Sequence, residues 1–174
     1  MDFSKEVEAT VNSTGEISKS DYVRWSKRGN LATRGRVYAL AASQWSRIQP
    51  EPQMSEHCAF MADYLLECLL TNPPADDYLH SGFDAAHELA AWLKHLAKDD
   101  AGRGIVADVA HRLATAYRAS DARTRNRIET GALEHALESP RVRPFFSAWE
   151  ADPILREAYG PALQWGLAHS EETG

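Results

Sequence analysis

Apolar residues recur every three or four positions along most of the chain, which is the spacing of one face of an α-helix. No segment alternates apolar and polar residues for long, as a half-buried strand would. The predicted helices cover about residues 3–11, 20–28, 33–48, 55–71, 81–97, 105–117 and 121–137, and another begins at Asp152. We therefore predict an all-α fold, either an irregular bundle of about seven or eight helices or a set of stacked helix hairpins.

Capping residues and breakers set the expected helix boundaries. Ser81 and Asp152 are predicted N-caps, and Pro153 suits the first turn of the helix that follows. The stretch from Asp99 to Gly104 is expected to be a turn, and Gly160-Pro161 is expected to kink or split the last helix. Gly131 is expected to be buried where two helices approach closely.

The length of 174 residues favours one domain over residues 1–174. The proline-containing stretch Gln49–Gln53 is the clearest break, and it divides the chain into an N-terminal helical arm, 1–50, and a main helical body, 53–169. Because the break is short, we interpret it as a corner between helices.

Composition and sorting features favour a cytoplasmic protein. Apolar residues make up 44% and charged residues 25% of the chain, as in ordinary globular domains. No apolar run is long enough to span a membrane, and the start of the chain is acidic and polar, unlike a secretory signal. Cys58 and Cys68 lie ten residues apart in one predicted helix, too far for a disulfide, so both are expected to be reduced.

Charge is distributed unevenly around a net value of −6. Seven basic residues and one acid lie between Lys19 and Arg47, whereas ten acids and two lysines lie between Glu51 and Asp100. The basic segment, which includes Trp25, has the composition of a nucleic-acid-binding arm and would suit a regulatory or adaptor protein. The rest of the chain is acidic and would repel nucleic acid. The basic segment is explained equally well if it docks on the chain's own acidic helices or on a second copy of the chain.

Asp-x-x-His occurs twice on consecutive predicted helices, as Asp84 with His87 and as Asp108 with His111. This spacing places each pair on one helix face, so the four residues are the candidate ligands of a metal-dependent helical-bundle enzyme. Bundle sites of that kind use Glu-x-x-His, however, and paired charges also stabilise exposed helices. With no other catalytic motif in the chain, we expect a non-enzymatic protein that needs no metal or cofactor.

The stretch from Arg125 to Phe146, RNRIETGALEHALESPRVRPFF, resembles small all-helical bacterial immunity proteins that are encoded beside polymorphic or contact-dependent toxins. Gly131, Leu133, Glu134 and Leu137 carry this resemblance, after the turn at Ser120–Asp121, and it extends over about the last hundred residues, from Glu67. It implies an acidic cytosolic protein that occludes a cognate toxin domain and catalyses no reaction.

Candidate partner-binding residues follow from composition. An acidic face would steer a basic toxin domain toward the protein, and aromatic side chains are enriched at binding hot spots. The candidates are the acids and aromatics of the central acidic region, namely Asp76, Asp77, Tyr78, Asp84, Glu88 and Trp92.

Overall fold

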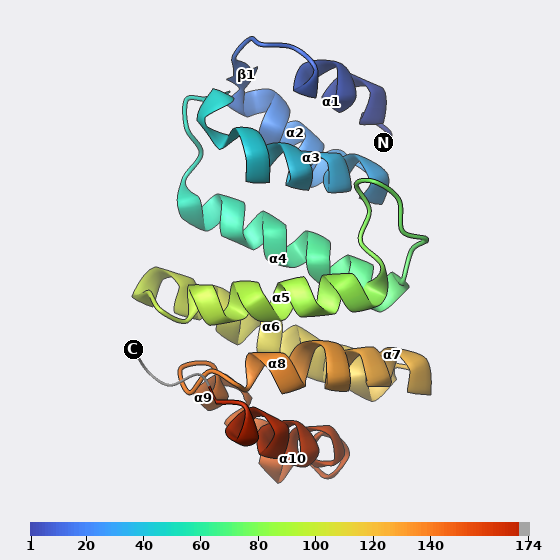
Figure 1. The fold of residues 1–174 in the computed structure, drawn as a ribbon, viewed down its shortest axis with the longest axis vertical. Coiled ribbons are helices and arrows are strands. Elements are labelled where there is room, and N and C mark those ends of the chain that lie inside the picture. The colour runs from blue at the N-terminus through green and yellow to red at the C-terminus, as the bar shows by residue number, and fades with distance from the viewer. Residues whose placement is uncertain (171–174) are drawn as a thin grey trace.

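The computed structural model describes residues 1–170, and its helices lie in layers stacked along the long axis of the molecule (Figure 1). The N-terminal α1 lies at one end of the stack and α10 at the other. The longer elements are α1 (Ser4–Val11), α2 (Lys19–Arg28), α3 (Leu31–Gln44), α4 (Met54–Thr71), α5 (Gly82–Leu96), α6 (Asp100–Ala119) and α10 (Pro153–Ala168). The shorter ones are η1 (Trp45–Arg47), α7 (Ala122–Asn126), η2 (Arg127–Leu133), α8 (Glu134–Ala136), α9 (Arg143–Phe146) and η3 (Ser147–Ala151). The predicted all-α fold is confirmed.

A small sheet closes the N-terminal layer, and the hydrophobic pattern does not predict it. Its strands are β1 (Ile17–Ser18) and β2 (Ile48–Gln49), which pair in parallel with Ile17 opposite Ile48. Both isoleucines are buried, whereas two-residue strands are too short to produce a visible alternation. The pairing joins the segment before α2 to the segment before α4, in which the Gln49–Pro50 peptide bond is cis.

Within residues 1–170, four of the seven basic residues of the N-terminal segment pair with acids of this same chain, namely Lys19, Arg24, Arg34 and Arg36. Lys19 Nζ lies 3.2 Å from a carboxylate oxygen of Glu56 on α4, and the guanidinium of Arg34 pairs with Glu67 on the same helix. Part of the basic segment therefore docks on α4, one of the chain's own acidic helices.

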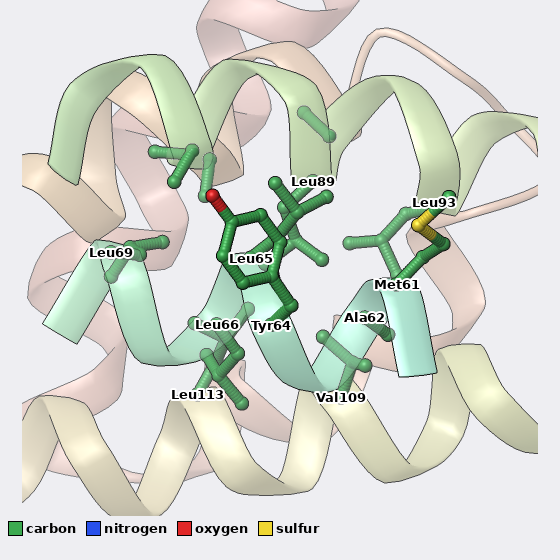
Figure 2. Packing of buried hydrophobic residues seen from close by; sticks show 14 of the residues in the cluster. Met61, Ala62, Tyr64, Leu65, Leu66, Leu69, Leu89, Leu93, Val109 and Leu113 are labelled. Carbon is green, nitrogen blue, oxygen red and sulfur yellow. The ribbon is translucent and has the colours of Figure 1, made fainter. Parts of the chain in front are cut away.

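Helix α4 lies at the centre of the core and packs on two neighbours. Met61 faces Leu93 of α5, while Ala62 and Leu66 face Val109 and Leu113 of α6 (Figure 2). All six side chains are buried. A helix with apolar residues on two faces is expected in the interior of a helical stack.

The helix predicted from residue 121 extends to Ala136, but Arg127–Leu133 forms a π-helical segment within it. Gly131 lies in this segment, and a Cβ there would come within 2.7 Å of the Ala86 side chain of α5. The prediction that Gly131 permits a close approach of two helices is therefore confirmed.

The turn predicted over Asp99–Gly104 is wrong from Asp100 onward, and the last helix is not split at Pro161. Gly102 lies inside α6 rather than in a turn, because Asp99 is extended at the N-cap and the glycine packs tightly on the Leu96 carbonyl. Helix α10 continues through Pro161, since Ala158 and Ala162 on either side are both held in the core. Conversely, α9 and η3 were not predicted.

The described residues, 1–170, include no helix with the length and apolarity that a membrane crossing requires.

Candidate partner-binding surface

Four polar or aromatic residues follow one face of α5. Asp84, Glu88, Trp92 and His95 are spaced by four, four and three residues, which keeps them within about one quarter of the helix circumference. Asp84 and His95 are exposed, and Glu88 and Trp92 are half-buried. The Ser81 hydroxyl donates to Asp84 Oδ2 at 2.6 Å and accepts from the Asp84 amide, which fixes the start of the helix.

Tyr38 of α3 joins two of these side chains in a hydrogen-bonded chain. Trp92 Nε1 donates to Tyr38 Oη at 3.1 Å, and Tyr38 Oη donates to Glu88 Oε1 at 2.7 Å. Burial, and then the bond to Glu88, raise the pKa of Tyr38, so its hydroxyl stays protonated at neutral pH. The indole of Trp92 and the carboxylate of Glu88 are therefore held in a defined arrangement.

A further aromatic ring extends this surface onto the loop before α5. The His80 ring lies 5.1 Å from the Tyr38 ring. We call the set comprising Asp84, Glu88, Trp92 and His95 with the adjoining Tyr38 and His80 the acidic–aromatic strip.

The loop between α4 and α5 carries the other three predicted residues. Asp76 Oδ1 accepts from the amides of Tyr78 at 2.8 Å and Leu79 at 2.7 Å, so this carboxylate shapes the loop. The Arg36 guanidinium lies over the Tyr78 ring, with Arg36 Cζ 4.8 Å from the ring centroid. Asp77 is exposed. The loop meets the strip through the contact between His80 and Tyr38.

The structure thus places Asp84, Glu88 and Trp92 on one surface and Asp76, Asp77 and Tyr78 on the neighbouring loop. Sequence reasoning missed Tyr38 and His80. Tyr38 lies seven residues before Trp45, the spacing of two helical turns, so a search for aromatic pairs at that spacing would have found it.

The two Asp-x-x-His pairs have separate surroundings. Asp84 bonds to Ser81, whereas the His87 ring contacts the His135 ring of α8 at 4.8 Å between centroids. Asp108 accepts from Arg112 at 3.3 Å, and His111 is exposed. Among residues 1–170, no three or more His, Cys, Asp or Glu side chains are grouped so that they could hold a metal ion.

Both cysteines are free and buried. Burial raises the pKa of Cys58, and it raises that of Cys68 to about 11, so both thiols stay protonated at neutral pH. His57, which precedes Cys58, is engaged through Nδ1 with the Tyr22 hydroxyl at 2.8 Å. This arrangement does not supply the thiolate that cysteine nucleophiles need.

Buried His57 makes stability depend on pH. Burial lowers its pKa to about 4, whereas a histidine in the unfolded chain titrates near about 6.5. Between these values the unfolded chain binds more protons, so the stabilisation is complete above about pH 6.5 and is lost as the pH falls towards about 4. We expect the free energy of unfolding to decrease by about 2 kcal/mol over that interval.

Urea denaturation at a series of pH values measures this effect, with His57→Gln as the test variant. Glutamine keeps an acceptor for Tyr22 but does not titrate, so the pH dependence should flatten. His111→Gln, at an exposed position, should retain the full dependence. Equal slopes for the wild type and His57→Gln would contradict the assignment.

No family model, curated protein or solved structure matches the chain.

Proposed function

We propose that this protein is a non-catalytic immunity protein that captures a basic bacterial toxin domain on the acidic–aromatic strip. The chain of hydrogen bonds from Trp92 through Tyr38 to Glu88 is the observation that carries the proposal. Capture would take place in the cytoplasm and would occlude the toxin's active site or substrate surface.

A fixed indole beside a carboxylate suits an arginine or lysine of a basic partner. Carboxylates accept charge-assisted hydrogen bonds from such groups, and indole faces attract cations. Because Glu88 Oε1 and the Trp92 N–H are already bonded to Tyr38, little side-chain freedom remains to be lost on binding. The exposed carboxylates of Asp77 and Asp84 would accelerate the encounter by long-range attraction.

The resemblance of residues 125–146 to helical immunity proteins agrees with this role. Those residues lie in α7, η2, α8, α9 and the turn between α8 and α9, and none of them belongs to the strip. The resemblance therefore concerns the scaffold, while the proposed contacts belong to α3 and α5.

Trp92→Ala should weaken capture of the toxin by about 30-fold, because it removes a half-buried aromatic anchor and the donor to Tyr38. The partner to use is the catalytically inactivated toxin domain encoded next to this protein's gene, with affinity measured by isothermal titration calorimetry. Glu88→Gln should mainly slow association and reduce its salt dependence, as measured by stopped-flow fluorescence.

Trp165→Ala is the matched control, because Trp165 is also partly exposed but lies on α10 at the far end of the stack (Figure 1). It should leave affinity unchanged. Circular dichroism checks that each variant folds, and Trp92→Phe, which keeps a ring but loses the N–H, should give a smaller loss than alanine. If the adjacent gene product does not bind, or binds the Trp92 and Trp165 variants equally, the proposal is wrong.

A further inference from the structure

A cleft of about 450 Å³ lies between α2 and α4, away from the α5 residues of the acidic–aromatic strip. Tyr22, Val23 and Lys27 line it from α2, Ala59 and Phe60 from α4, and Arg34 from α3. This volume falls within the range of ordinary small-molecule sites.

The apolar part of the cleft is aromatic. The rings of Tyr22 and Phe60 meet edge to face with centroids 6.0 Å apart, and both residues are buried. Since the Tyr22 hydroxyl is bonded to His57, the ring has a fixed position. Such a wall suits a flat apolar group.

The polar groups without partners at this cleft are cationic. Arg34 uses Nη2 for its pair with Glu67, while its buried Nε has no hydrogen-bond acceptor in the part of the chain that the structure describes. Within residues 1–170, no carboxylate lies at ion-pair distance from the exposed Lys27 ammonium.

The acids at the cleft already have cationic partners. Glu56 pairs with Lys19 at 3.2 Å, and Asp63 pairs with Arg112 of α6. Arg34 is likewise paired with Glu67, so within residues 1–170 Lys27 is the charged group lining the cleft that has no ion-pair partner. An anionic group can therefore be accommodated beside the aromatic wall.

We propose that this cleft binds a small organic carboxylate with an aromatic body, the carboxylate lying at Lys27 and Arg34 and the ring against Tyr22 and Phe60. This binding site is separate from the acidic–aromatic strip proposed for toxin capture, because it is lined by residues of α2, α3 and α4 that do not belong to the strip. It can be tested on the full-length protein with no toxin present, so that failure of either proposal leaves the other unaffected.

The probes are 3-phenylpropionate, indole-3-propionate and 2-naphthylacetate, each paired with its uncharged amide and titrated by calorimetry and by NMR of the aromatic resonances. At least one carboxylate should bind with saturation at one site, and its amide should bind about tenfold more weakly. Lys27→Met should weaken binding about tenfold, while Lys5→Met, at an exposed lysine on α1, should have no effect.

Ala59→Trp provides a test that retains every charge. Ala59 is exposed and lines the cleft, so the larger side chain should fill it and abolish binding without unfolding the protein. Circular dichroism verifies the fold. The proposal is overturned if none of the three carboxylates saturates below about 10 mM, if the amides bind equally well, or if Ala59→Trp binds like the wild type.

Discussion

Replacing Arg127 with methionine is expected to lower the free energy of unfolding by about 4 kcal/mol. Arg127 is a buried cation whose side chain is only 8% exposed. Its Nε donates to the Leu69 carbonyl at 2.9 Å and its Nη2 to Thr124 Oγ1 at 2.8 Å. Leu69 belongs to the last turn of α4, where backbone carbonyls have no partner within the helix and the helix dipole favours a positive charge.

Methionine fills part of the space but supplies no donor, so the Leu69 carbonyl and the Thr124 hydroxyl would be left buried and less well satisfied. The start of α5 is also affected, because Gly82 packs closely against the Arg127 side chain. One side chain thus holds the end of α4, the start of α5 and η2 together.

Arg123→Met is the control, since Arg123 is exposed on α7, one helical turn before Arg127. Its replacement should change stability by less than about 0.5 kcal/mol. Urea denaturation followed by circular dichroism measures both variants. A loss at Arg127 no greater than that at Arg123 would show that the buried hydrogen bonds contribute little.

Arg127 also illustrates where sequence reasoning reaches its limit. Periodicity predicts the helix that contains it, because the apolar spacing of Ile128, Ala132 and Leu133 is local. The bond to Leu69 joins residues 58 positions apart, and no local pattern encodes it. No sequence pattern predicts the π-helical segment either, in which Gly131 packs closely against Ala86 of α5.

The same distinction applies to the candidate surface. Asp84, Glu88 and Trp92 are predictable as one face because they share one helix. Tyr38 lies on α3, which packs on α4, and only its side chain reaches Glu88 and Trp92 on α5, so its role appears only in the structure. The metal hypothesis depends on which helices lie side by side. The Asp-x-x-His spacing places each pair on one helix face, but it does not determine which helix that face contacts. In the structure the His87 ring contacts the His135 ring of α8.

Gly166→Ala is expected to lower the free energy of unfolding by about 3 kcal/mol. A Cβ at Gly166 would lie 2.5 Å from both the carbonyl carbon and the oxygen of Leu137, and 2.9 Å from the Glu138 nitrogen. These are backbone atoms, which cannot rotate away as the tip of a flexible side chain can. The methyl group must therefore push α10 away from the end of α8.

That displacement would also disturb Arg143, which bridges the two segments. Its Nε donates to the Leu137 carbonyl at 2.7 Å, and its Nη2 donates to the Gly166 carbonyl at 3.2 Å. Lengthening either bond removes a charge-assisted interaction from a partly buried site. The steric effect and the loss of hydrogen bonding therefore act in the same direction.

Gly160→Ala makes the same substitution in the same helix with the opposite expected result. A Cβ at Gly160 meets nothing within 4 Å, so only the higher helix propensity of alanine remains, and stability should stay the same or rise by up to about 1 kcal/mol. Urea denaturation of both variants compares them directly. If both substitutions stabilise the protein, α10 does not pack against Leu137 as described. If both destabilise it to the same extent, close packing at Gly166 is not the cause of the loss, because Gly160 has open space around it.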